Sequence, residues 1–166
     1  LIAAGVDGFL HGRLGPDPFL RDAVRSGVAD RLLERPEATP GPESREAELA
    51  AALGRLLEAG ATIVLGTDAG AIPDHFFGYT GHRELEILVR LGMTPMQALV
   101  AGTGAAAAAL HLEDTGALAP GFRADFVVLG ADPLEDIRNT RRIEAVYLGG
   151  QRVDREGLRA GWTDAR

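Results

Sequence analysis

The stretch Ile63-Val64-Leu65-Gly66-Thr67-Asp68-Ala69-Gly70 decides the fold class of this 166-residue chain. Its first three residues belong to an apolar run, residues 61–65, in which polar and apolar positions do not alternate. Strands without alternation are typical of parallel α/β sheets, whose strands are buried on both faces. We therefore predict a buried parallel strand at residues 61–65 that leads into a glycine-rich turn at Asp68.

Helical patterns lie on both sides of this strand. Before it, Ser44 is placed as the N-cap of a helix with an apolar i, i+3, i+4 stripe, and Gly60 ends that helix. After it, we predict a helix at residues 82–91 with Leu85, Leu88 and Val89 facing inward, a helix that starts with Thr94-Pro95-Met96-Gln97, and an alanine-rich helix after Thr103. Residues 13–44 contain no clear apolar strand, although they have room for a helix or two.

Beyond residue 113 the pattern changes to that of an antiparallel sheet. We predict strands at residues 124–129 and 143–148, and Gly149-Gly150 joins the second strand to residues 151–153 as a two-residue hairpin. The last ten residues are expected to form a loose tail. The expected organisation is an α/β portion at residues 1–112, a small β portion at residues 113–155 and a tail at residues 156–166.

Composition excludes several classes of function. A net charge of −7, from 24 acidic and 17 basic residues, argues against a nucleic-acid partner or an anionic membrane. The absence of cysteine removes disulfides and thiolate metal sites and fits a cytoplasmic location. All the basic residues are arginine, so no lysine can form a Schiff base or bridge two metals. No apolar run reaches the roughly 20 residues of a membrane span. Histidine and carboxylate chemistry remains, which points to metals or to acid–base catalysis.

His11 and Asp68 are the residues best placed for chemistry. Each directly follows an apolar segment, and functional groups converge at the carboxyl ends of strands in α/β sheets and barrels. A histidine and an aspartate at two such ends suit metal ligands, or a base with its orienting partner. Structural roles fit the same local pattern, because an aspartate after a strand commonly forms a turn and a lone histidine is commonly satisfied structurally. His75, in a loop, and His82, at the start of a helix, are weaker candidates.

Several segments resemble the metal-dependent amidohydrolase superfamily. Residues 63–70 look like its last barrel strand, and His82-Arg83-Glu84-Leu85-Glu86 together with residues 92–99 is similar to the helices that follow that strand. Residues 116–129, 132–137 and 146–153 resemble its return into a β-sandwich, and residues 5–12 resemble the sixth barrel strand with its histidine. The imidazolonepropionase-like and Xaa-Pro dipeptidase-like branch fits best.

The resemblance implies a fold and an activity. The fold is the C-terminal part of a TIM (β/α)8 barrel, strands six to eight with the following helices, plus part of a small β-sandwich. The activity is metal-dependent hydrolysis of carbon–nitrogen bonds in a small amide, cyclic amide or dipeptide. Asp68 would be the strand-eight aspartate, a metal ligand and the general base for the attacking water, and His11 the strand-six histidine, a metal ligand and catalytic partner. His75 and His82 would line the substrate pocket, and the cofactor would be one or two divalent ions, with zinc expected.

The chain also departs from the family's pattern. Its histidines are 11, 75, 82 and 111, so the His-any-His pair of the first barrel strand is absent, and strand seven is not evident. Because catalytic zinc normally has three protein ligands, we expect this chain alone to be inactive and to need a missing N-terminal barrel portion. Unpaired strand edges would favour association between copies. Two alternatives stay open, a deaminase on the same fold and a truncated structural or interaction module without catalysis.

Overall fold

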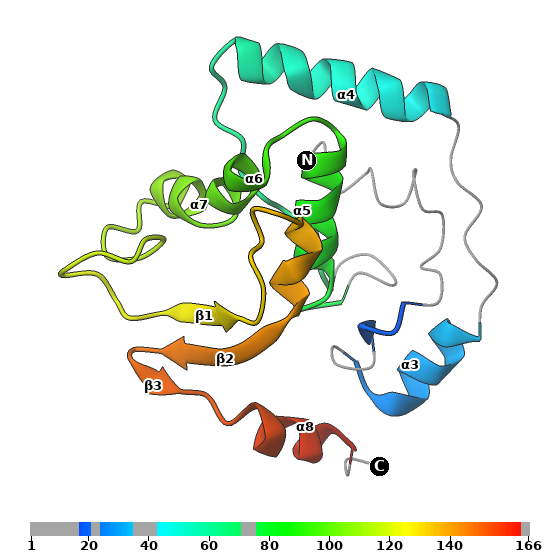
Figure 1. Ribbon diagram of the computed structural model, residues 1–166, viewed down its shortest axis with the longest axis vertical. Helices are drawn as coiled ribbons and strands as arrows, with labels where there is room; N and C mark the ends of the chain where they lie inside the picture. The colour runs from blue at the N-terminus through cyan, green and yellow to red at the C-terminus, as the bar shows by residue number, and fades with distance from the viewer. Residues whose placement is uncertain (1–16, 21–23, 35–42, 71–75, 164–166) are drawn as a thin grey trace.

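The computed structural model describes residues 17–20, 24–34, 43–70 and 76–163 (Figure 1). Its elements, in chain order, are α3 (Ser26–Leu33), α4 (Glu43–Glu58), α5 (Thr80–Arg90), α6 (Pro95–Ala101), α7 (Gly104–Ala109), β1 (Phe126–Leu129), the 3-10 helix η1 (Ile137–Arg141), β2 (Ile143–Leu148), β3 (Gln151–Arg152) and α8 (Arg155–Thr163). Among these residues, no helix combines the length and the apolar character needed to cross a membrane.

The main apolar core joins α4, α5 and α6. Its buried members are Leu53, Ile87, Leu88, Leu91, Met93, Ala98 and Ala101. Burial of these side chains is the main force that holds the three helices together, since each carries an apolar stripe on one side. A second, smaller cluster places Leu20 and Tyr79 together below α5, with Val28 of α3 packed against them.

The start of α6 confirms the predicted helix cap. Thr94 Oγ1 accepts a hydrogen bond of 3.2 Å from the Gln97 backbone, and Gln97 Oε1 accepts one of 2.8 Å from the Thr94 backbone. Pro95 occupies the first turn, where its missing N–H costs nothing. Helix α5 starts at Thr80, two residues before the predicted position, and Leu88 is buried as predicted. Leu85 and Val89 are only partly buried, against the same core.

The three strands form one antiparallel sheet in the order β1-β2-β3. Phe126 pairs with Tyr147, and the two rings stack with centroids 4.5 Å apart. Gly149 and Gly150 both have positive φ, 57° and 78°, as a two-residue turn of type I′ requires. The predicted hairpin is therefore confirmed, while the first predicted strand begins at Phe126 rather than at residue 124.

Three further sequence-based expectations differ from the structure. Helix α4 begins at Glu43, so Ser44 lies inside its first turn and is not the predicted N-cap. Residues 61–65 form no strand in the described part of the chain. The Leu65 N–H instead donates a hydrogen bond of 3.0 Å to the carbonyl of Ala101, at the end of α6. No described strand pairs with them, so Val64 remains 38% exposed and the predicted burial on both faces is not observed. Instead of a loose tail, the described residues from Arg155 to Thr163 form α8, whose first turn is capped by Asp154 Oδ1, which accepts a hydrogen bond of 2.9 Å from the Gly157 N–H.

Candidate active site

Asp68 follows the segment 63–65 and has an exposed side chain. The turn after it is closed by its neighbour, because Thr67 Oγ1 accepts a hydrogen bond of 3.2 Å from the Ala69 N–H. Within the ranges that the structure describes, no hydrogen bond or ion pair engages the Asp68 carboxylate. The turn-forming role that an aspartate commonly has after a strand is thus filled by Thr67, and the Asp68 carboxylate remains available to solvent.

The backbone at Asp68 is unusual. Its φ is 50°, in the left-handed region that residues other than glycine seldom adopt. Such a conformation costs about 1–2 kcal/mol, although aspartate tolerates it better than most residues. Backbone strain of this kind is concentrated at active sites and ligand clamps. The conformation agrees with a functional role for Asp68.

Gly70 and Phe77 meet beside this turn. Gly70 has a φ of 85°, and Cε2 and Cζ of the Phe77 ring lie 2.9 Å from the position that a Cβ would take on Gly70. Only glycine allows the ring to approach the backbone so closely, because real Cβ atoms essentially never make contacts under 3.0 Å. The Phe77 ring therefore lies against Gly70, which follows Asp68 by two residues in the sequence.

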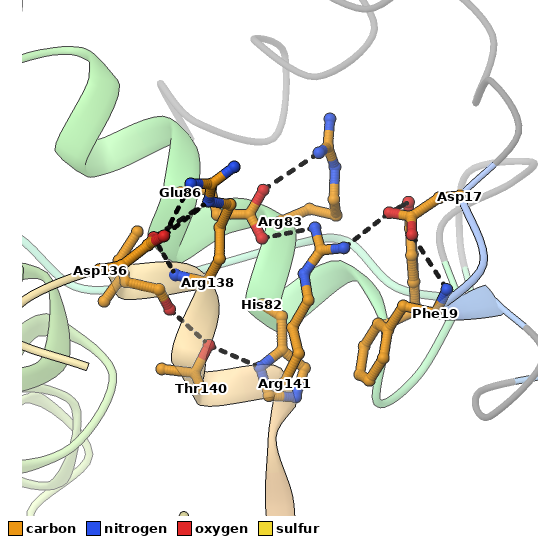
Figure 2. Close-up of polar contacts among 11 residues, drawn as sticks. Asp17, Phe19, His82, Arg83, Glu86, Asp136, Arg138, Thr140 and Arg141 are labelled. Atoms are coloured by element: carbon orange, nitrogen blue, oxygen red, sulfur yellow. Dashed lines mark hydrogen bonds and ion pairs between the residues drawn. The ribbon is translucent and has the colours of Figure 1, made fainter. Parts of the chain in front are cut away.

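His82 lies on α5 and faces η1 (Figure 2). Its Nδ1 is 2.9 Å from Thr140 Oγ1, and that hydroxyl donates its own hydrogen to the Ile137 carbonyl at 2.9 Å. A hydroxyl has one hydrogen to donate, so His82 is the donor through Nδ1. The imidazole also lies nearly perpendicular to the Phe19 ring, with the two ring centroids 5.1 Å apart. Burial, with the positive charge of Arg141, lowers the pKa of His82 to about 4, which keeps the ring neutral at pH 7.

His11 and His75, the other two predicted site residues, lie outside the described residues. Within those residues, no three His, Asp or Glu side chains gather closely enough to hold a metal ion. Asp68 supplies one carboxylate, whereas catalytic zinc normally has three protein ligands. The described residues therefore do not by themselves fit a complete metal site.

Sequence reasoning missed a polar cluster, which we name the Arg141 cluster. Figure 2 shows its members Asp17, Phe19, Glu86 and Arg141, and Tyr79 joins them through its hydroxyl. Arg141 Nη1 lies 2.8 Å from Asp17 Oδ2, and Arg141 Nη2 forms an ion pair with Glu86 Oε1. Tyr79 donates its hydroxyl hydrogen to Asp17 Oδ2 at 2.9 Å, and the guanidinium lies over the Phe19 ring, 5.2 Å from its centroid. No local signal could have shown this cluster, because its members come from three distant segments.

The charges of the Arg141 cluster compensate one another. Burial would raise the pKa of Asp17, but the Phe19 N–H, the Arg141 charge and the Tyr79 hydroxyl together hold it below its usual value. Burial raises the pKa of Glu86, and the Arg141 and Arg83 charges offset part of that shift. Perturbed pKa values can mark a reactive centre, but structural ion-pair networks perturb them equally. Here both carboxylates pair with Arg141, so the cluster is best explained as the contact that joins η1 to α5.

Comparisons with known proteins decide the family. Residues 19–153 match the Amidohydrolase family. The chain belongs to this family. The resemblance seen in the sequence is therefore confirmed, including the branch, since imidazolonepropionases and Xaa-Pro dipeptidases are among the proteins that this chain matches.

Two relatives illustrate the similarity of sequence. The imidazolonepropionase of Deinococcus deserti is 43% identical over 103 residues, which cover 60% of this chain and 25% of that protein. The imidazolonepropionase of Cutibacterium acnes is 40% identical over 115 residues, which cover 66% of this chain and 26% of that protein. The amidohydrolase chain thus spans about a quarter of the length of these relatives.

Solved structures show the same relationship. A molinate hydrolase structure matches with a TM-score of 0.58 and 36% identity, over 63% of this chain and 26% of that one. A Xaa-Pro dipeptidase structure with methionine bound in its active site matches with a TM-score of 0.56 and 28% identity, over 63% of this chain and 25% of that one. The described fold of this chain is therefore similar to part of the amidohydrolase fold.

Proposed function

We propose that this amidohydrolase is the C-terminal part of a metal-dependent hydrolase that acts on carbon–nitrogen bonds in amides, cyclic amides or dipeptides. The names of its relatives support this class, since they include imidazolonepropionases, a phenylurea hydrolase and a Xaa-Pro dipeptidase. The family is generally metal-dependent. The observation that carries the proposal is the exposed Asp68 carboxylate, which has no partner among the described residues and stands on a left-handed backbone.

In this proposal the helices α4 to α7 and the segment 61–68 belong to the last part of a TIM barrel, and β1 to β3 belong to a small β-sandwich. The boundary between the two portions lies near residue 112. The apolar segment 61–65 that precedes Asp68 would be the eighth barrel strand, and the hydrogen bond from the Leu65 N–H to the Ala101 carbonyl places it beside the end of α6. The carboxyl end of such a strand is where TIM-barrel enzymes place their reactive groups.

Asp68 would act as a metal ligand and as the general base. As the base, its carboxylate would accept a proton from the attacking water and deliver it to the leaving nitrogen. His11 would be a second ligand, and the remaining ligands would come from outside the described residues; zinc is the proposed metal. His75 and His82 would line the substrate pocket, and the contact of His82 Nδ1 with Thr140 would leave Nε2 for a ligand.

Zinc binding tests this proposal directly. We expect the 166-residue chain to bind zinc weakly, and Asp68→Asn to weaken that binding at least about tenfold, since it removes one charged oxygen ligand. Glu135→Gln is the matched control, because Glu135 is also an exposed carboxylate. Isothermal titration calorimetry measures all three proteins. Equal zinc affinity for the wild type and Asp68→Asn would contradict the assignment of Asp68.

The activity of the chain alone is a separate expectation. Because the described residues do not complete a metal site, we expect no turnover of amide or dipeptide substrates by the isolated chain. Hydrolysis at enzyme-like rates that a chelator abolishes would show that this expectation is wrong while supporting the proposed reaction.

We also propose that further polypeptide covers the sheet at β1. Strand β1 is an edge of the described sheet, and its Val127 and Val128 are both exposed. Open edges with apolar side chains favour association with other strands. Analytical ultracentrifugation should therefore show self-association of the isolated chain. A monomer that melts in one sharp transition would contradict this.

A further inference from the structure

Phe76 and Phe77 are adjacent aromatic residues with opposite surroundings. Phe76 packs against the cluster of Leu20 and Tyr79. Phe77 is 76% exposed and belongs to neither apolar cluster of the described residues. Ligand sites combine apolar walls with a few polar groups, so an exposed ring near a candidate catalytic group can supply one such wall.

The turn that carries Phe77 is well fixed. The Phe76 carbonyl accepts hydrogen bonds from the Tyr79 N–H at 3.2 Å, the Thr80 N–H at 3.0 Å and Thr80 Oγ1 at 2.8 Å. Tyr79 and Thr80 are both buried, so this turn is anchored at the start of α5. The exposure of Phe77 is therefore a property of an ordered turn.

The Phe77 ring lies against the turn that carries Asp68. It rests on Gly70, within 2.9 Å of the position of an added Cβ. Since consecutive Cα atoms are 3.8 Å apart, the Cα of Gly70 lies within about 7.6 Å of the Cα of Asp68. An exposed ring and an exposed carboxylate thus share one neighbourhood at the end of the segment 63–70.

We propose that Phe77 is a specificity-determining residue that contacts an apolar side group of the substrate next to the bond on which Asp68 acts. This inference rests on the proposed hydrolase function and narrows its substrate class to amides or dipeptides with an aliphatic or aromatic side group. Contact with an aromatic ring favours such groups over a hydrogen atom. The absence of a Cβ on Gly70 lets the ring lie against this turn, whereas a larger residue there would displace it.

Binding of two small amides tests the proposal on the 166-residue chain. The probes are N-acetyl-leucine amide and N-acetyl-glycine amide, and NMR titration gives their dissociation constants. We expect the leucine probe to bind roughly tenfold more tightly and to shift the Phe77 ring signals. Phe77→Ala should abolish this preference and Phe77→Leu should keep part of it. Phe122→Ala, which removes an exposed aromatic ring elsewhere, should leave it unchanged.

The outcomes separate this proposal from the proposed function. The inference is overturned if the leucine probe does not saturate, if Phe77→Ala keeps the preference, or if Phe122→Ala loses it equally. Zinc titration of Asp68→Asn, measured on the same preparations, reports on the hydrolase function alone. One combination of results would separate the two proposals. If Asp68→Asn loses zinc affinity while Phe77→Ala keeps the preference for the leucine probe, the proposed hydrolase function is supported and the role of Phe77 is wrong.

Discussion

Arg141 and Asp17 are separated by 124 positions in sequence, yet Nη1 of the arginine donates a 2.8 Å hydrogen bond to Oδ2 of the aspartate (Figure 2). The same guanidinium forms an ion pair with Glu86 on α5. One side chain on η1 therefore connects the beginning of the described chain, the central helix and the segment that leads into β2. This contact explains how the sheet portion is held on the helical portion.

Replacing Arg141 should strongly destabilise the protein. Arg141→Met keeps much of the aliphatic volume but leaves the partly buried Asp17 carboxylate without its cation and Glu86 with Arg83 alone. Breaking a buried ion pair on one side costs about 3–5 kcal/mol, and the partial exposure of this pair places the expected loss at the lower end. Urea unfolding, followed by circular dichroism, measures the change.

Arg138→Gln is the matched control for this prediction. Arg138 also lies on η1 and pairs with Asp136 at 2.7 Å, but its side chain is 71% exposed. Exposed ion pairs contribute about 0–1 kcal/mol, so this variant should unfold almost like the wild type. Similar losses in the two variants would show that burial is not what makes the Arg141 contact important.

Local patterns were sufficient to predict the helices and the hairpin. The capping box at Thr94 and the two glycines at 149 and 150 act within a few residues, so their geometry follows from the sequence alone. The sequence analysis does not predict α8, although Asp154 lies where it can cap the first turn of that helix. The family assignment also followed from the order of several short motifs.

Long-range features could not be predicted in the same way. The residues 61–65 have the composition of a buried strand, but a strand also needs paired neighbours, and none of the described strands supplies them. The approach of Phe77 to Gly70 and the pairing of Arg141 with Asp17 depend on how the elements pack. Asp68 could be selected by its position after the apolar run, whereas its left-handed backbone and the role of Thr67 in the turn needed coordinates.

The neutral His82 should make stability depend on pH. Its folded pKa of about 4 lies below the ordinary value of 6.5, so the unfolded chain binds more protons between these two values. Stability from this residue is fully present above pH 6.5 and decreases as the pH falls towards 4, by at most about 1.4 kcal/mol per pH unit. The charge facing the ring is Arg141, and the other contacts are Thr140 and Phe19.

Urea midpoints at pH 7.5, 6 and 5 measure this dependence. His82→Gln retains a side-chain donor for Thr140 but does not titrate, so the variant should show a smaller loss of stability on acidification than the wild type. Identical pH profiles for the two proteins would mean that His82 does not change its protonation on unfolding in this range.

The cap of α6 gives a prediction of smaller size. Thr94→Ala removes the hydroxyl that accepts the Gln97 N–H, and loss of such a cap costs about 1 kcal/mol. Thr94 is exposed, so little packing is lost. Thr94→Ser keeps the oxygen and should restore nearly all of the stability in urea unfolding. If serine were as destabilising as alanine, the hydroxyl bond would not be the cause.

Gly116 and Gly121 have nearly the same φ but different surroundings, so an alanine at each position distinguishes the cost of backbone strain from the cost of overpacking. Gly116 has a φ of 85° and Gly121 a φ of 89°, so an alanine is strained at both positions, by about 1–2 kcal/mol. A Cβ on Gly116 would lie 2.7 Å from the Ala107 Cβ and 3.0 Å from the Thr103 carbonyl oxygen, whereas one on Gly121 meets nothing within 4 Å. Gly116→Ala should therefore lose about 1–3 kcal/mol more than Gly121→Ala, because it also overpacks the contact with α7. Equal losses in thermal unfolding would assign the whole effect to the backbone and would show that the loop after α7 can move away from the helix without cost.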